Sequence, residues 1–178
     1  AELGATTSVF PTDENALAYL KQQGREDEYV EMKADDDATY DETIEIDMST
    51  LVPMVAQPHS PDNVVDVKEL EGMKINQVVI GSCTNSSLPD MMRAAKILKG
   101  RKVAEDVSLV IAPGSSSILS MLAQNGALAD MIHAGARILE CGCGPCIGMG
   151  QAPLSKGVSL RTINRNFKGR SGTNDASV

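Results

Sequence analysis

Apolar and polar positions follow a regular order from residue 74 onward. Short apolar runs rich in β-branched residues predict four strands, at 76–82, 106–114, 136–140 and 158–166. Amphipathic stretches predict the helices between them, at 88–100, 116–126 and 127–135. Because strands alternate with helices, we expect an α/β fold of three layers (α/β/α), with a mostly parallel, doubly wound sheet and helices on both of its faces.

The earlier part of the chain is less regular. A helix is predicted at 12–23, where Thr12 or Asp13 can cap the start. The segment ETIEIDMS (42–49) alternates apolar and polar residues, which predicts a short exposed strand. The prolines of 53–63 favour extended or turning chain.

These patterns suggest a single domain over residues 1–178. Residues 1–73 would form an irregular leading region with the helix at 12–23, and residues 74–178 a regular core of strands and helices. The chain opens without Met and stops without a helix stop or a polar tail, which is typical of a piece of a longer protein. Residues 25–73 suggest no function of their own.

Composition narrows the possible functions. Lys and Arg total 16 and Asp and Glu total 24, for a formal net charge of −8. Binding to nucleic acid through a general basic face is therefore not expected. No apolar run is long enough to span a membrane, and no secretion signal is visible. Four cysteines in a chain that can build its own core favour a reduced, cytoplasmic setting.

Chemistry-bearing residues follow three of the four predicted strands. Cys83 comes after the first strand, Cys143 and Cys146 after the third, and the segment NRNFKGR (164–170) ends the fourth. Parallel strands place their carboxyl ends on one edge of a sheet, where ligands of open α/β folds bind. We therefore expect these residues to meet at one site.

The pair Cys143-x-x-Cys146 has three interpretations: a redox pair, half of a zinc site, or two ligands of an iron–sulfur cluster. A redox pair normally has no third thiol from another strand, and structural zinc needs four ligands. Cys141 and Cys143 would point in opposite directions on an extended backbone, so Cys141 is expected to be a small buried residue. Three thiols remain, with Cys83 as the third.

Three thiolates suit a [4Fe–4S] cluster with one open iron. Clusters that carry electrons usually have four cysteine ligands, whereas an open iron can bind substrate as a Lewis acid. Arg165 and Arg170 lie near the same strand end, and arginine binds carboxylates with two hydrogen bonds. Asn164 adds a neutral donor and acceptor. A polycarboxylate held against the open iron is the simplest substrate class.

Four segments carry a resemblance to a known family. The motifs IGSCTNSS (80–87), CGPCIGMG (143–150) and NRNFKGR (164–170), with the opening AELGATTSVFP (1–11), resemble the aconitase family of iron–sulfur hydro-lyases. The resemblance covers essentially the whole chain and only the third domain of that family. It implies that the remaining domains of the same enzyme are partners of this one.

The resemblance also implies roles for individual residues. Cys83, Cys143 and Cys146 would ligate the cluster, and Asn164 would lie beside it. Glu2 would help to orient the water or hydroxyl on the open iron. The catalytic base would lie outside this chain, so the isolated segment should be inactive. Without the other domains that shield it, the cluster is expected to be lost from the isolated segment.

Arg165 and Arg170 would contact the carboxylates of a tricarboxylate substrate. The motif CTNSS looks more like aconitate hydratase, which interconverts citrate and isocitrate through cis-aconitate. The alternative is an isopropylmalate or homoaconitate dehydratase, in which a Gly-Arg pair more often follows the Asn. Cys141 departs from aconitase relatives, which commonly have another residue there. A non-catalytic iron–sulfur or zinc-binding module is the alternative from another class.

Overall fold

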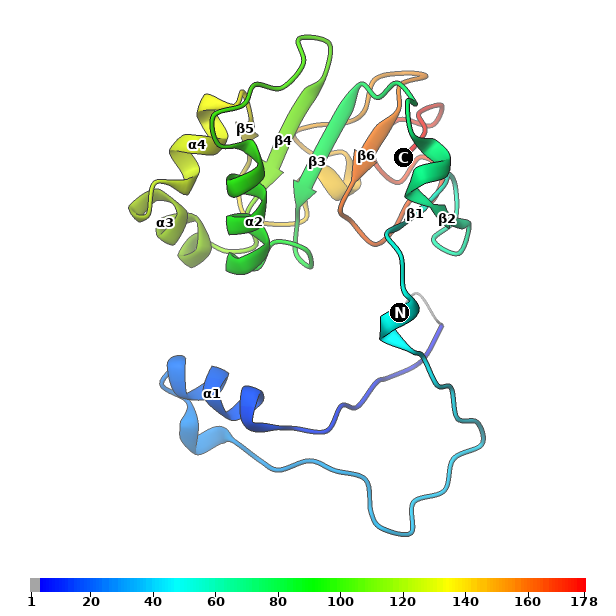
Figure 1. Cartoon of the computed structure of the whole chain (residues 1–178), viewed down its shortest axis with the longest axis vertical. Coiled ribbons are helices and arrows are strands. Elements are labelled where there is room, and N and C mark those ends of the chain that lie inside the picture. Colours follow the sequence, from blue (N-terminus) through cyan, green and yellow to red (C-terminus); the bar gives the residue numbers. More distant parts are fainter. Residues whose placement is uncertain (1–3) are drawn as a thin grey trace. The chain divides into compact units, whose positions relative to one another are not determined.

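A computed structural model describes residues 4–178 of the chain. The chain divides into two compact units, Ala1–Leu51 and Val52–Val178. Figure 1 labels the helices and strands of both units. Glu2, which the resemblance places at the active site, lies outside the described residues.

The first unit has one α-helix, α1 (Glu14–Gln22), and two short 3-10 helices, η1 (Glu26–Glu28) and η2 (Met48–Thr50). A carboxylate oxygen of Asp13 accepts a hydrogen bond from the backbone N–H of Ala16 at 2.9 Å, so Asp13 is the cap. The predicted helix is confirmed. The predicted strand at 42–49 is wrong: residues 42–47 pair with no strand of the described chain, and Met48 and Ser49 belong to η2. The whole segment is exposed, so water solvates its backbone.

The second unit begins with a small hairpin. β1 (Met54–Ala56) pairs antiparallel with β2 (Val64–Asp66), and η3 (Val67–Leu70) follows directly. The proline-rich segment predicted to be extended or turning therefore holds a three-residue strand and the connection between the two strands.

A four-stranded parallel sheet forms the centre of the second unit. The strands are β3 (Gln77–Gly81), β4 (Ser108–Ala112), β5 (Arg137–Ile138) and β6 (Ser159–Arg161). Their order in space is β5-β4-β3-β6, and every neighbouring pair is parallel. The predicted α/β fold with a parallel sheet is confirmed. Because all four strands run the same way, their carboxyl ends share one edge.

Three helices pack together against one face of this sheet: α2 (Leu88–Leu98), α3 (Ser116–Gln124) and α4 (Ala127–His133). Met91, Leu122 and Met131 from these helices form a core with Ile111 of β4, and all four side chains are fully buried. Burying each such side chain contributes about 1.5–3 kcal/mol. The helices therefore hold the sheet rigid from this side.

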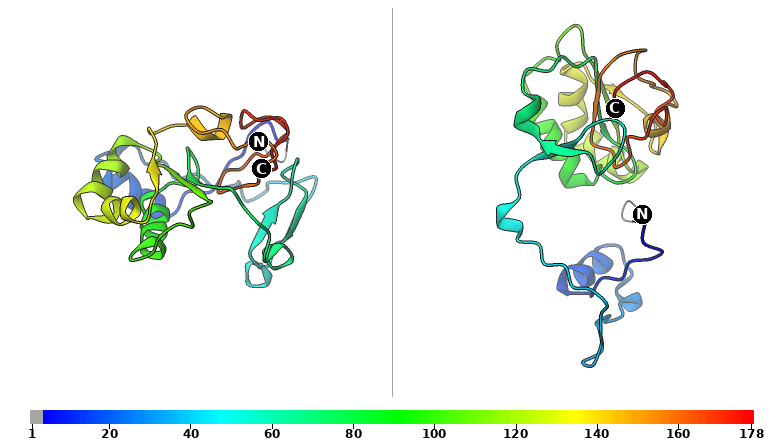
Figure 2. Two further views of the ribbon diagram at one scale, coloured as in Figure 1. Left: turned by 90° about the horizontal axis from the view of Figure 1, so that it is seen from above. Right: turned by 90° about the vertical axis from the view of Figure 1, so that its right-hand side faces the viewer.

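The opposite face is covered mainly by irregular chain. Here the short 3-10 helix η4 (Gly144–Ile147) lies across the sheet from α2. Figure 2 shows α2 in green and η4 in orange on opposite sides of the strands. This second covering layer contains the cysteine loop, so the segment that closes the fold also carries the candidate chemistry.

Candidate functional site

The chain turns sharply where β3 ends and Cys83 begins. Gly81 has φ +111°, and a Cβ atom there would lie 2.1 Å from the carbonyl oxygen of Ala112. Ser82 follows with φ 76°, a left-handed conformation that is costly for a residue with a side chain. The backbone N–H of Gly81 donates to Oγ1 of Thr162 at 2.9 Å. This turn directs the chain out of the sheet and leaves Cys83 exposed.

Cys83 and Cys143 come from different strands and meet at this edge. Each thiol shifts the pKa of the other, and no disulfide joins them. The hydroxyl of Thr84, followed by the Cys143 thiol, lowers the pKa of Cys83. The same contact with Cys83 raises the pKa of Cys143. The two thiols therefore titrate as an interacting pair.

Cys146 lies on the inner side of the same loop and is only 7% exposed. Its backbone N–H donates to the carbonyl of Cys143 at 2.8 Å, which fixes the spacing of the two cysteines. Nη2 of Arg170 donates to the Cys146 sulfur at 3.4 Å. Arg170 thus touches one of the thiols predicted to bind metal.

Asn164 is held by Asn85, a residue that the sequence analysis did not single out. Nδ2 of Asn85 donates to Oδ1 of Asn164 at 2.8 Å and also to the carbonyl of Thr162. Asn85 lies in the polar turn two residues after Cys83, so its position in the motif CTNSS was the available signal. The contact joins the end of β3 to the segment that follows β6.

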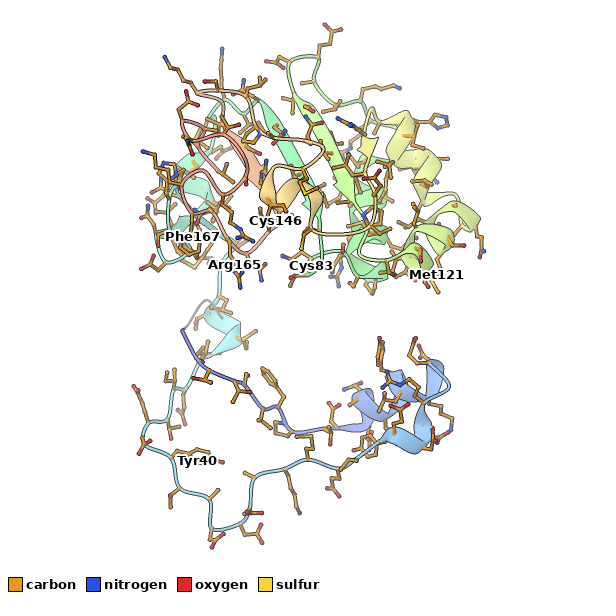
Figure 3. All side chains as sticks on the ribbon, turned by 180° about the vertical axis from the view of Figure 1, so that it is seen from behind. Tyr40, Cys83, Met121, Cys146, Arg165 and Phe167 are labelled. Atoms are coloured by element: carbon orange, nitrogen blue, oxygen red, sulfur yellow. The ribbon has the colours of Figure 1, made fainter. Side chains whose placement is uncertain are left out.

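Arg165 lines a pocket of about 300 Å³ together with Asn85 and Asn164. Figure 3 shows Arg165, Cys83 and Cys146 on the same side of the second unit. The structure therefore gathers the three thiols, Arg170 and the Asn85–Asn164 pair along the strand-end edge, with Arg165 in the adjoining pocket.

The residues at this edge fit an iron–sulfur cluster better than a single metal ion. Among residues 4–178, no three His, Cys, Asp or Glu side chains are placed to hold one ion. A cluster is larger than an ion, and each thiolate ligand binds a different iron. The three thiols can therefore lie farther apart than the ligands of a single ion. Two buried polar atoms here, Oγ of Ser82 and Nε of Arg170, have no hydrogen-bond partner. Such donors can serve cluster sulfur or a substrate.

Cys141 is separate from this group. It is half-buried, whereas the sequence suggested a buried residue. The interactions that shift the pKa values of Cys83 and Cys143 come from each other, from Cys146 and from nearby polar groups, and Cys141 is not among them.

Comparison with known proteins agrees with this geometry. The sequence model of the aconitase family (aconitate hydratase) matches residues 1–71 and 66–177. This chain belongs to the aconitase family. The resemblance seen in the motifs is thereby confirmed.

Three relatives indicate the part of the aconitase family to which the chain is similar. It is 46% identical to 3-isopropylmalate dehydratase large subunit 2 of Archaeoglobus fulgidus, over 99% of this chain and 43% of that protein. It is 42% identical to 3-isopropylmalate dehydratase large subunit 1 of Thermotoga maritima, over 99% of this chain and 43% of the relative. It is 44% identical to the methanogen homoaconitase large subunit of Methanocaldococcus jannaschii, over 96% of this chain and 43% of that protein.

The chain therefore spans less than half the length of these relatives. Within residues 4–178, no helix of this aconitase-family chain is long and apolar enough to cross a membrane.

Proposed function

We propose that this chain is the cluster-holding part of an aconitase-family hydro-lyase of the 3-isopropylmalate dehydratase type. The observation that carries the proposal is the contact of Arg170 with the Cys146 sulfur, beside Cys83 and Cys143, each of which shifts the pKa of the other. An arginine on a thiol places a carboxylate-binding group next to a metal ligand. The similarity to two dehydratase large subunits and a homoaconitase supports the same chemistry.

Cys83, Cys143 and Cys146 would hold a [4Fe–4S] cluster. When bound, the cluster supplies one open iron, a Lewis acid toward the hydroxyl that leaves the substrate. The chain's own residues fix the ligand geometry. The turn at Gly81 presents Cys83, and the hydrogen bond within the loop sets Cys146 relative to Cys143.

Arg165 and Arg170 would bind the carboxylates of a hydroxy di- or tricarboxylate. Each guanidinium has five N–H donors, so Arg170 can donate to Cys146 and still present donors to a carboxylate. Asn164, oriented by Asn85, would contact the cluster or the substrate from the other side of Cys83. Glu2 keeps its proposed role with the water or hydroxyl. The base that removes the carbon-bound proton would come from a part of the enzyme outside this chain.

The relatives favour a substrate other than the one expected from the sequence. The motif CTNSS suggested isomerisation of citrate to isocitrate, whereas the relatives are named for 3-isopropylmalate and for homoaconitase. They are large subunits, which supports a small-subunit partner for the complete enzyme. That partner is a natural place for the missing base.

One local observation supports citrate as a second candidate substrate. Ser86 and Ser87 stand where the isopropylmalate and homoaconitate enzymes more often have Gly-Arg. Ser86 is 1% exposed and donates to the carbonyl of Ser82, and Ser87 caps α2 through a capping box with Asp90. Neither serine offers a cation to a substrate, so an arginine contact of that kind is missing here.

The substrate can be decided by steady-state kinetics. The complete enzyme, with its other domains and any small subunit, would be reconstituted with iron and sulfide and supplied separately with 3-isopropylmalate, homocitrate and citrate. We expect kcat/KM to be highest for 3-isopropylmalate. A preference for citrate would establish the second candidate. Activity on none of the three, with a cluster present, would contradict the proposed function.

A further inference from the structure

A buried polar network behind the cysteine loop centres on Arg161, which the proposed function does not use. Arg161 lies in β6. Its Nη1 donates to the carbonyl of Pro145 and, at 3.0 Å, to Oγ of Ser171. Its Nη2 donates to Oε1 of Gln77 at 2.8 Å, and its Nε to Oγ of Ser159 at 2.8 Å. One guanidinium therefore ties two strands of the sheet to the cysteine loop and to the loop of Arg170.

The network reaches Cys146 from two directions. Arg161 holds the carbonyl of Pro145, the residue before Cys146. Ser171, which accepts from Arg161, donates its hydroxyl to the carbonyl of Cys146 at 3.3 Å. Both peptide units around the Cys146 Cα are thus fixed to the same cation. Arg170, next to Ser171, is the residue that contacts the Cys146 sulfur.

Among residues 4–178, no carboxylate compensates the charge of Arg161. None of the ion pairs formed among these residues includes it, and its four hydrogen-bond partners are carbonyl, amide and hydroxyl oxygens. Burial lowers the pKa of Arg161 to about 10, so it stays positive at neutral pH. A partly buried cation without a counter-ion is costly, and an anion is expected nearby. Electrostatic interaction with Cys146 acts against this lowering and favours the charged guanidinium.

We propose that Arg161 is a positioning residue of the cluster site. It locks the backbone on both sides of Cys146 against the sheet, and it places a fixed positive charge behind the anionic thiolate ligand. The first role follows from the geometry of this chain alone. The second rests on the proposed function, because it requires a cluster. Hydrogen bonds and charges near the sulfurs are known to set the reduction potential of such clusters.

The first experiment tests the backbone role without a cluster. Hydrogen–deuterium exchange would be measured on the cluster-free chain and on the variants Arg161→Gln and Arg161→Lys, with Arg101→Gln, at an exposed arginine, as control. We expect Arg161→Gln to raise exchange in the peptide covering 143–149 by about tenfold, because buried partners lose a charged hydrogen bond. Exchange in α2 and β4 should stay unchanged, and Arg161→Lys should restore part of the protection.

The second experiment tests the electrostatic role in the complete enzyme after reconstitution with iron and sulfide. Losing a nearby positive charge makes electron uptake less favourable, so the reduction potential of the cluster should be lower in Arg161→Gln and close to wild type in Arg161→Lys and Arg101→Gln. The inference is overturned if Arg161→Gln matches wild type in both experiments, or if exchange rises equally in every peptide. If wild type assembles no cluster, the proposed function fails, and the exchange comparison alone decides the role of Arg161.

Discussion

The guanidinium of Arg170 lies on the sulfur of Cys146, with 3.4 Å between nitrogen and sulfur. The sequence suggested separate tasks for these two residues, one binding a carboxylate and the other a metal. Their contact connects the two proposed roles, because a carboxylate bound by Arg170 would then lie beside Cys146, the proposed metal ligand. The Nε of Arg170 is buried without a partner, which leaves a donor for such a group.

Replacing Arg170 should therefore damage substrate binding and the cluster environment together. In the complete enzyme, Arg170→Lys keeps the charge and loses the paired donors, so we expect kcat/KM to fall roughly 10- to 100-fold. The control is Lys168→Gln, which removes an exposed cation from the same loop and should have little effect. Equal kinetics for Arg170→Lys and wild type would remove Arg170 from the site.

Asn85 and Asn164 should affect catalysis as one unit, because the first orients the second. Asn85→Ala removes the donor that orients Asn164, and Asn164→Ala removes the oriented group itself. We expect each single variant to lower kcat/KM and the double variant to lose little more, with an interaction energy of about 0.5–3 kcal/mol. Strictly additive losses would mean that the two asparagines act independently.

The turn before Cys83 should tolerate no side chain at Gly81. In Gly81→Ala the new Cβ would meet the carbonyl of Ala112 at a positive φ, so we expect a loss of about 2–4 kcal/mol in the free energy of unfolding. Gly100→Ala is the control, since Gly100 has φ +70° but nothing within 4 Å of a Cβ. Chemical denaturation would compare the two, and equal losses would show that conformational strain, and not the close approach, sets the cost.

The core between the sheet and the three helices should contribute most to the free energy of unfolding. Met131 is fully buried, whereas Met121 is 47% exposed on the neighbouring helix. Met131→Ala should cost about 2–5 kcal/mol in unfolding free energy, and Met121→Ala should stay within about 0.5 kcal/mol. Similar denaturation midpoints for the two variants would contradict the assigned core.

The sequence predicted the parts of the fold that depend on local pattern. The strand at Gln77–Gly81 and the helix at Leu88–Leu98 have clear periods and a capping serine, and both lie where expected. The proximity of Cys83 and Cys143 could be predicted from the parallel arrangement of the strands alone. The strand prediction for 42–49 was wrong because an alternating pattern defines the two faces of a strand but does not provide a neighbouring strand for it to pair with.

The supporting contacts of the site were beyond sequence reasoning. Asn85 and Asn164 are separated by 79 positions, and nothing in either local pattern indicates the other. Arg161 occupies a strand position at which a charged side chain would be expected to face water. It lies beneath the cysteine loop because irregular chain, instead of a helix, covers that face of the sheet.

The ligand set is tested most directly by identifying which thiols a cluster protects. The complete enzyme would be alkylated before and after reconstitution with iron and sulfide, and each cysteine of residues 1–178 would be assigned by mass spectrometry. Cys83, Cys143 and Cys146 should be protected together after reconstitution, while Cys141 remains reactive. Protection of Cys141 as well, or continued reactivity of Cys83, would contradict a three-thiol site.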